Sequence, residues 1–346
     1  MKLVVHQSAL SERGDSVNAE NISIGLQNYY GIESVITAPK SKFNNANRIF
    51  EMKAKGINVQ LYDDLRGLWK IAEKFEATHA YFMLDGHFSN LWIPDTKHLS
   101  HCVFRPFEPH GDKYAYVSEW LFNKAKRIRN TIDRQMIEKQ RAITGTPHNL
   151  NFDLEVSWVP HSVVPKFPEF GKFRSKYGFS IRDKIIGRIG GYDQFNDTAA
   201  MLAVEKISKK TPNVHFFFVN TKQFIQAPNV HYVDYLSESD KWSMYQDCDL
   251  FLNGRAMGES FGFSIVEPLM VGKPVLAPDQ LRHPRMDAHH MHLLRPQNLT
   301  YFSAKGLEKK IYNLLENQYD SKSLTESVRK YSLSNSTTKF FDYFLN

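Results

Sequence analysis

The sequence predicts an α/β protein built from two doubly wound parallel-sheet domains that face a central cleft. The chain of 346 residues is too long for one comfortable hydrophobic core. Short β-branched or aromatic segments alternate with amphipathic segments, which is the pattern of βαβ units. A proline-bearing stretch at 159–170 separates two series of such units.

The first series comprises seven predicted strands, with helical segments between the early ones. These strands are expected at 2–6, 33–37, 57–62, 79–84, 102–104, 115–118 and 155–160. A long helix is expected near 119–142, between the last two strands. The final segment, 336–346, carries Phe340, Phe341 and Phe344, which form a docking face if the segment is helical.

The second series follows the proline-bearing stretch. Its strands are expected at 184–189, 214–220, 230–235, 248–253 and 273–278. Fully apolar runs, such as HFFFV at 215–219, suit strands that are covered on both faces, as in parallel sheets. We therefore predict one domain over 1–163 with a C-terminal helix at 331–346, and a second domain over 164–330.

Composition indicates a folded protein of a reducing compartment. The chain is 42% hydrophobic and 13% aromatic, which argues against disorder. Cys102 and Cys248 are too few for a disulfide framework or a cysteine zinc site. No run approaches the ~20 apolar residues of a membrane span, and the amino-terminal apolar run is too short for a secretion signal. We expect a cytoplasmic protein.

The formal net charge of +7 favours anionic partners without choosing among nucleotides, lipid surfaces and nucleic acid. Basic residues gather at 124–134, opposite Phe122, Ile128 and Ile132 on a predicted helix. The plainer interpretation is a solvated helix face, and the alternative is peripheral contact with an anionic membrane. Because no nucleic-acid motif accompanies the basic residues, a nucleic-acid partner is not expected.

The strongest chemical signal is the segment 253–278, which leads from one predicted strand to the next. Gly254, Gly258 and Gly262 permit close backbone approach and positive φ angles. Backbone amides at the opening of a helix bind phosphate. The amides expected to do so belong to Ser260, Phe261, Gly262, Phe263 and Ser264.

Glu267 is predicted to bind a ribose. It follows Gly262 by five residues, which places it roughly 7.5 Å further along a helix. This distance approximates that from a diphosphate to its ribose. A carboxylate offers two acceptor oxygens to the two donors of a ribose diol.

Glu259 and Glu267, separated by seven residues, and the following Gly272-Lys273-Pro274-Val275 together resemble the signature of family-4 retaining glycosyltransferases of the GT-B fold. Weaker similarity covers nearly the whole chain, including GRIGG at 187–191. The resemblance implies two Rossmann-like domains and a nucleoside-diphosphate sugar donor. It also implies that Glu259 faces the transferred sugar and that Glu267 holds the ribose.

Arg188 is the predicted phosphate ligand of the other strand end. It lies at the end of the strand 184–189 and precedes Gly190 and Gly191, and its guanidinium can bind phosphate oxygens through two parallel hydrogen bonds. The family usually adds a lysine later in this loop, which is missing here. Arg255 and Lys222, at the ends of neighbouring strands, are the two candidates for the second positive charge.

The nucleotide base is expected near Tyr235 and Leu236, because the family usually binds it there through backbone groups. The identity of the base is therefore not visible in the sequence, and UDP- and GDP-sugars are both considered. Tyr235 equally fits a core aromatic residue.

The first domain is expected to hold the acceptor, a glycan or a lipid-linked hydroxyl. Gly14 and Asp15 resemble the family's amino-terminal glycine loop, although Asp15 also fits a helix cap. His110, in a polar turn with Asp112, is the candidate for contacting the transferred sugar. His87 and His101 are its rivals, and each histidine also fits a structural role.

No metal ion or cofactor is expected. The histidine cluster at 283–292 lacks a HExxH pattern and an evident cysteine or carboxylate partner. The resemblance likewise implies catalysis without a metal. The sequence thus predicts a metal-independent, retaining transferase of glycan biosynthesis. A GT-B sugar-nucleotide epimerase and, less favoured, a basic nucleic-acid-binding protein are the alternatives.

Overall fold

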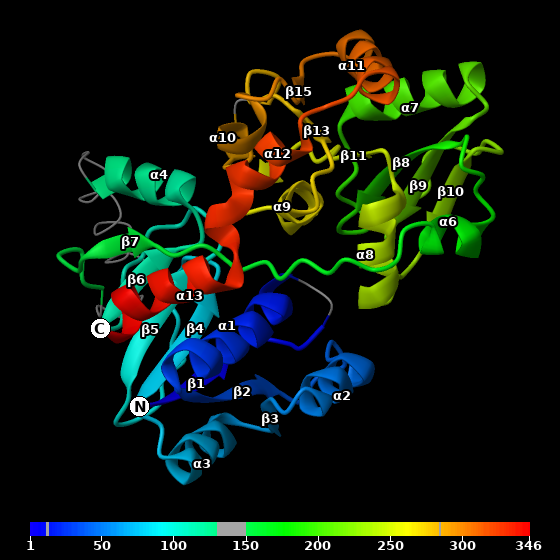
Figure 1. Ribbon diagram of the computed structural model, residues 1–346. Helices are drawn as coiled ribbons and strands as arrows, with labels where there is room; N and C mark the ends of the chain where they lie inside the picture. Colours follow the sequence, from blue (N-terminus) through cyan, green and yellow to red (C-terminus); the bar gives the residue numbers. More distant parts are fainter. Residues whose placement is uncertain (12–13, 130–149, 284) are drawn as a thin grey trace. The chain divides into compact units, whose positions relative to one another are not determined.

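The computed structural model describes residues 1–11, 14–129, 150–283 and 285–346, which form two compact units (Figure 1). The first unit comprises Met1–Ser162 and Tyr331–Asn346, and the second comprises Val163–Lys330. Each unit is built on one parallel sheet.

The first unit has a seven-stranded sheet in the order β3-β2-β1-β4-β5-β6-β7, with every pair parallel. Its strands are β1 (Lys2–His6), β2 (Glu33–Pro39), β3 (Asn58–Tyr62), β4 (His79–Leu84), β5 (Lys97–Cys102), β6 (Lys113–Tyr116) and β7 (Val156–Trp158). The chain winds in one direction from β1 to β3 and in the other from β4 to β7. The topological switch therefore lies between β1 and β4.

Both faces of this sheet are buried, as the apolar strands require. Leu3 and Val5 of β1 belong to one core cluster and Val4 belongs to another, because successive side chains of a strand point to opposite faces. The helices of the unit are α1 (Gly14–Tyr30), α2 (Ala46–Ala54), α3 (Leu65–Phe75), α4 (Glu119–Arg129) and α13 (Leu333–Phe340). Asn45 and Asp64 cap α2 and α3 through side-chain acceptors.

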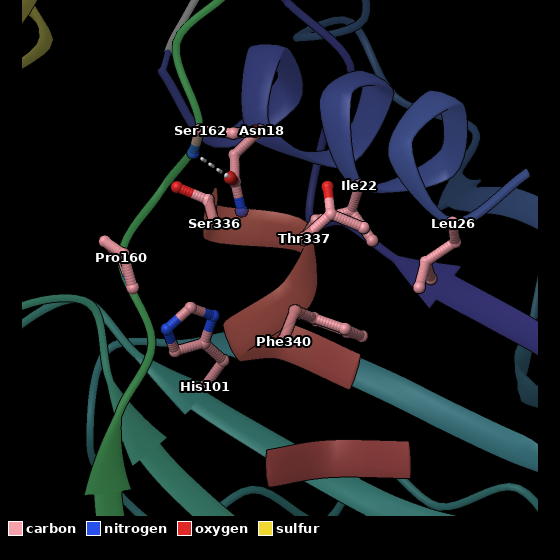
Figure 2. Close-up of a pocket in the computed structure, with 9 residues that line it drawn as sticks. All are labelled: Asn18, Ile22, Leu26, His101, Pro160, Ser162, Ser336, Thr337 and Phe340. Atoms are coloured by element: carbon pink, nitrogen blue, oxygen red, sulfur yellow. Dashed lines mark hydrogen bonds between the residues drawn. The ribbon is translucent and has the colours of Figure 1, made fainter. Parts of the chain in front are cut away.

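The C-terminal segment packs in the first unit. Phe340 and Phe344 are buried and contact Tyr81 of β4, and the ring of Phe341 stacks 4.0 Å from that of Tyr30. A cavity of about 10 Å³ lies between α1, α13 and the stretch 160–162, which has room for about one water molecule (Figure 2). The segment is thus an integral part of this core.

The second unit has a six-stranded parallel sheet in the order β10-β9-β8-β11-β13-β15. Its strands are β8 (Lys184–Ile189), β9 (Val214–Val219), β10 (Val230–Val233), β11 (Leu250–Leu252), β13 (Val275–Pro278) and β15 (Thr300–Tyr301). Its helices are α6 (Lys172–Tyr177), α7 (Thr198–Lys210), α8 (Glu238–Asp247), α9 (Phe263–Met270), α10 (Met291–Leu294), α11 (Ala304–Glu316) and α12 (Ser321–Val328). The switch lies between β8 and β11.

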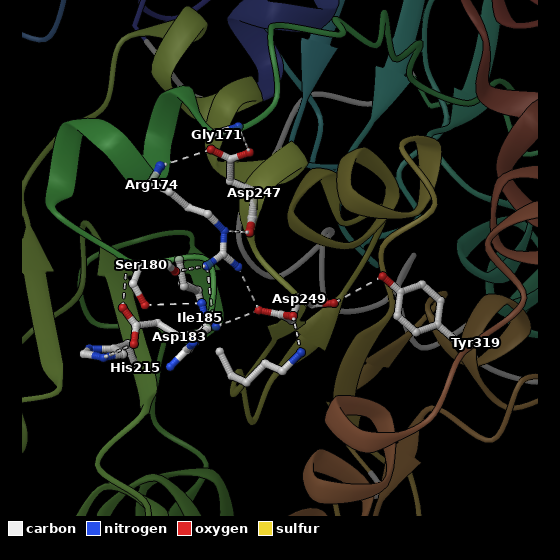
Figure 3. Close-up of polar contacts among 11 residues, drawn as sticks. Gly171, Arg174, Ser180, Asp183, Ile185, His215, Asp247, Asp249 and Tyr319 are labelled. Atoms are coloured by element: carbon white, nitrogen blue, oxygen red, sulfur yellow. Dashed lines mark hydrogen bonds and ion pairs between the residues drawn. The ribbon is translucent and has the colours of Figure 1, made fainter.

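Ion pairs fasten the amino edge of this sheet (Figure 3). Asp249 precedes β11 and accepts from Arg174 at 3.1 Å, from Lys184 at 3.3 Å and from the amide of Ile185. Asp247 accepts from the amides that open α6. These contacts set the relative position of β8 and β11, whose opposite ends frame the candidate site.

Two predicted elements differ from the structure. The strand expected at 102–104 is β5 at Lys97–Cys102, in which two buried histidines, His98 and His101, obscure the apolar pattern of a strand. The helix expected near 119–142 is described only as α4, to Arg129. The last five residues of the basic run, 130–134, with Ile132 among them, lie outside the described residues. Within the described part of the chain, no helix is long and apolar enough to cross a bilayer.

Candidate functional site

Two loops frame the candidate site at the carboxyl edge of the second sheet. The loop after β8 and the loop after β11 meet at the topological switch, where ligands of open α/β sheets bind. The amides of Asn196 and Asp197 donate to the carbonyl of Gly254 at 2.9 and 2.8 Å. These hydrogen bonds fasten the two loops to each other and fix the positions of their side chains.

Glu259 is held by both of its carboxylate oxygens. It lies in the short strand β12 (Gly258–Glu259) and is 9% exposed. Oε1 accepts from Asn253 Nδ2 at 3.0 Å, and Oε2 accepts from Arg255 Nη1 at 2.9 Å. Asn253 Nδ2 also donates to Ser264 Oγ at 3.3 Å. The carboxylate is therefore oriented by the end of β11 and the first turn of α9.

Two glycines allow this arrangement because no other residue fits. Gly258 has φ +68°, and a Cβ there would lie 1.9 Å from the carbonyl oxygen of Asp287. Gly262 has φ +87°, and its Cβ would lie 2.9 Å from the Cβ of Glu259. The predicted need for positive φ is thus met at both positions, and Gly262 brings the start of α9 against Glu259.

The start of α9 lies slightly later than the predicted phosphate-binding run suggests. Gly262 is the N-cap, and its carbonyl accepts from the amides of Ile265 and Val266. Ser260 and Phe261 form the turn before the helix, and the ring of Phe261 is buried 5.1 Å from that of Phe263. Amides in the first turn of a helix have no carbonyl one turn earlier and face its N-terminal side.

Glu267 is buried in α9 and is bound by two residues of α8. Its Oε1 accepts from Lys241 Nζ at 2.7 Å, and its Oε2 accepts from the hydroxyl of Tyr245 at 2.7 Å. The pKa of Tyr245 is raised well above its usual value by burial and by the adjacent carboxylate, so the hydroxyl stays a donor. Sequence reasoning missed both partners.

Arg188 lies at the end of β8 and is 5% exposed. Its Nη1 donates to the carbonyls of Val219 and Asn220 and to the hydroxyl of Thr221, and its Nη2 donates to the carbonyl of Gly191 at 2.9 Å. Burial lowers the pKa of Arg188 to about 10, and the group remains charged at neutral pH. Arg188 forms no salt bridge with the described residues.

Gly190 leaves room beside this guanidinium. A Cβ at Gly190 would lie 2.7 Å from Nη2 of Arg188 and 3.5 Å from its Nε. A guanidinium has five N–H groups. Within the described residues, Nε and one hydrogen of Nη2 have no acceptor, and these are the groups beside Gly190.

The remaining predicted residues differ in exposure. Lys222 donates its amide to the carbonyl of Tyr192, and its exposed ammonium forms no ion pair within the described part of the chain. Tyr235 is 55% exposed, so its interpretation as a core aromatic residue is wrong. Leu236 is buried beside it. Both follow β10 at the same edge of the sheet.

Asp197 is a third buried carboxylate near the site, and sequence reasoning did not assign it. It caps α7 and accepts from Arg282 Nε and from His283 Nε2, both at 2.7 Å. Burial acts to raise the pKa of Asp197, but these hydrogen bonds hold it below its usual value. Its position before a helix was visible in the sequence, whereas its partners lie more than 80 residues away.

Two of the four histidines at 283–292, His289 and His290, lie in the interior of the second unit. Burial lowers the pKa of His289 to about 3 and that of His290 to about 4, so both rings are neutral near pH 7. Among the described residues, no group of three or more His, Cys, Asp and Glu side chains is arranged to hold a metal ion.

Three predicted acceptor-side residues lie at the carboxyl ends of β1 and β4. Gly14 is the first residue of α1, and Asp15 accepts from the amide of Ser16 at 2.9 Å. His87 follows β4, and its exposed ring lies 3.4 Å from the carboxylate of Glu108. These residues share the switch point of the first sheet.

The structure does not bring Asp112 to this group. Its amide and carboxylate bond the backbone of His98, at the amino end of β5, because the connection to a parallel strand must return across the sheet. His110, two residues earlier, is buried with its ring 5.0 Å from that of Phe88. His101 bonds Tyr81 and a backbone carbonyl through its two nitrogens, which accounts for it structurally.

Comparisons with known proteins bear on the fold of the chain and on the family of its second unit. Residues 202–331 match the family model of glycosyl transferases group 1. A search of curated proteins finds no match. A glycosyltransferase from Rickettsia africae is 13% identical with a TM-score of 0.65, and the alignment covers 100% of this chain and 99% of that one.

Two further solved structures illustrate the range of the fold. HepE from Anabaena, solved with UDP and glucose, is 12% identical with a TM-score of 0.62, over 99% of this chain and 95% of that one. A UDP-GlcNAc 2-epimerase from Neisseria meningitidis is 10% identical with a TM-score of 0.56, over the whole of both chains. The GT-B fold is confirmed, and the group 1 match confirms the prediction of a glycosyltransferase.

Proposed function

We propose that this glycosyltransferase transfers a sugar, with retention of anomeric configuration and without a metal ion, from a nucleoside diphosphate to a hydroxyl acceptor. One observation carries the proposal. Glu259 and Glu267 lie on either side of the first turns of α9, and each is oriented by a cation, Arg255 or Lys241. This arrangement offers two buried carboxylates and a helix N-terminus at one strand-end position.

Glu267 binds the ribose in this proposal. Each of its oxygens accepts one hydrogen bond from the protein, and a carboxylate oxygen can accept two. One further acceptor position on each oxygen therefore serves the two hydroxyls of a ribose. Lys241 and Tyr245 hold the carboxylate in a single orientation for them.

The diphosphate binds the amides of the first turn of α9 and Arg188. Arg188 offers the two N–H groups beside Gly190, where a side chain would collide with them. The helix dipole adds favourable potential for an anion at this end. Arg255 and Lys222 remain the candidates for a second cation.

The reaction breaks the bond between the sugar C1 and the phosphate oxygen as charge gathers on the leaving diphosphate. Arg188 and the helix amides stabilise that charge. The acceptor hydroxyl forms its bond to C1 on the same face, and the leaving phosphate oxygen takes its proton. No side-chain nucleophile is required, and Glu259 positions the transferred sugar.

The first unit supplies the acceptor side of the proposal, with Gly14, Asp15 and His87 as its candidates and His110 as the candidate for contacting the sugar. The acceptor is a glycan or a lipid-linked hydroxyl. The cytoplasmic location, with peripheral contact to an anionic membrane through the basic run, is part of the same proposal.

UDP is the first nucleotide to test, because HepE was solved with UDP and glucose. Calorimetry with UDP and GDP, followed by a panel of their sugars, should give one preferred donor. A Glu267→Ala variant should lose most of that affinity. If the wild-type chain binds no nucleoside diphosphate, the proposal is wrong. An inverted product in NMR would reject retention while leaving the donor site intact.

A sugar-nucleotide epimerase is the second candidate, favoured by the likeness to the epimerase from Neisseria meningitidis over the whole chain. An epimerase converts its donor without an acceptor. Incubation of the preferred nucleotide sugar alone separates the two, because only an epimerase yields an isomerised nucleotide sugar.

A further inference from the structure

Arg255 and Glu259 form an ion pair inside the site proposed for the nucleotide sugar, and both charges are ones that this substrate would use. Arg255 Nη1 lies 2.9 Å from Glu259 Oε2, and the two side chains are 21% and 11% exposed. Glu259 Oε1 already accepts from Asn253. With the pair closed, both oxygens of Glu259 have donors and the charge of Arg255 is neutralised.

Arg255 is the cation that can change partners. The guanidinium of Arg188 is bound to four acceptors and is buried. The side chain of Arg255 has Glu259 as its single acceptor within the described residues, and its amide is fixed by Asn253 Oδ1 at 3.1 Å. Because the backbone of Arg255 is held by Asn253 and its side chain by Glu259 alone, the guanidinium can rotate without disturbing the loop.

The three charged groups lie close enough to influence one another. Burial has the largest effect on the pKa of Arg188 and lowers it. The negative charge of Glu259 raises this pKa, and the positive charge of Arg255 lowers it. An anion bound beside Arg188 would therefore attract Arg255 and repel Glu259. A diphosphate carries more negative charge than one carboxylate, so it competes for Arg255.

We propose that Arg255 leaves Glu259 and binds the diphosphate when the donor enters, an inference that rests on the proposed donor site. No covalent bond changes, and one cation exchanges a carboxylate partner for a phosphate partner. While Arg255 is bound, Oε2 of Glu259 has one open acceptor position, and once Arg255 leaves, both acceptor positions are open to sugar hydroxyls. The exchange makes Arg255 a specificity residue that favours a nucleotide-linked sugar over a free sugar.

The test is the affinity for UDP, or for GDP if the wild type prefers it, in Glu259→Gln, Arg255→Gln and the double variant. Glu259→Gln should bind the nucleotide about fivefold more tightly, since no ion pair has to open. Adding Arg255→Gln to that variant should weaken binding about tenfold, because a direct phosphate ligand is lost. Lys209→Gln is the control, since it removes an exposed positive charge in the last turn of α7 in the same unit.

Two results would overturn the exchange. The double variant could bind as tightly as Glu259→Gln, which means that Arg255 serves only to neutralise Glu259. Alternatively, Glu259→Gln could bind no more tightly than the wild type. If Glu259→Gln does not fold by thermal melting, Glu259→Asp replaces it, because its shorter side chain loosens the pair in the same direction. A wild type that binds neither nucleotide defeats the proposed function itself, whereas binding without this pattern defeats only the exchange.

Discussion

Replacing Glu267 by Gln tests whether this buried carboxylate recognises the ribose of the donor. Gln keeps the volume and an acceptor for the hydroxyl of Tyr245, but it removes the charge that pairs with Lys241 at 2.7 Å. A hydrogen bond to a charged group contributes about 1.5–3 kcal/mol, equivalent to roughly 10- to 150-fold in affinity. The wild type should therefore prefer UDP to 2′-deoxy-UDP by about tenfold or more, and Glu267→Gln should lose most of that preference.

Calorimetry with the two nucleotides on both proteins gives the four affinities that this comparison needs. Glu205→Gln is the matched control, because it removes an exposed acid of α7 in the same unit. A thermal melt of each variant separates lost binding from lost folding. If Glu267→Gln lowers the affinity for both nucleotides by the same factor, the carboxylate only shapes the site and the ribose assignment is wrong.

Three further substitutions test the structure around the site. Gly262→Ala should cost about 1–3 kcal/mol in unfolding free energy, measured with urea, because φ is +87° and the new Cβ would press on Glu259. The hydrogen bond from Arg295 lowers the pKa of Asp279 to about 2, so its stabilisation is present above about pH 4 and is lost as pH falls toward 2. Asp279→Asn should therefore lose about 2 kcal/mol at pH 7 and approach the wild type near pH 2 in denaturant titrations. Lys222→Gln should change the unfolding free energy by less than about 0.5 kcal/mol, and a loss above about 1 kcal/mol would contradict its unpaired, exposed position.

The strands that the sequence predicted well are those whose burial leaves a visible pattern. β9 reads VHFFFV because both of its faces are covered, and few other structures tolerate such a run. β5 reads KHLSHC and was placed too late in the chain. Its histidines are buried because His101 finds Tyr81 and Val159, and His98 finds Ile93. Such partners exist only after the chain has folded.

The carboxylates of the candidate site were predictable and most of their partners were not. Glu259 and Glu267 stand at a recognisable spacing on one strand-end segment. Lys241, which orients Glu267, lies 26 residues earlier on another helix, and no local pattern connects them. Arg255 is different, because its position four residues before Glu259 could have suggested their ion pair. The prediction misplaced Asp112. The connection between β5 and β6 crosses back over the sheet, so the residues at its end, with Asp112 among them, lie at the amino edge and not at the carboxyl edge.

The structure also bears on the lysine that the loop after β8 lacks. That loop holds Arg188 in place through the carbonyl of Gly191, and Gly190 approaches the guanidinium too closely for a larger residue. In the proposed exchange, the second positive charge for the diphosphate is Arg255, which is paired with Glu259 until an anion competes for it. A free lysine in the loop would attract phosphate at all times. The proposed exchange of Arg255 would couple phosphate binding to the release of Glu259, which a free lysine in the loop would not do.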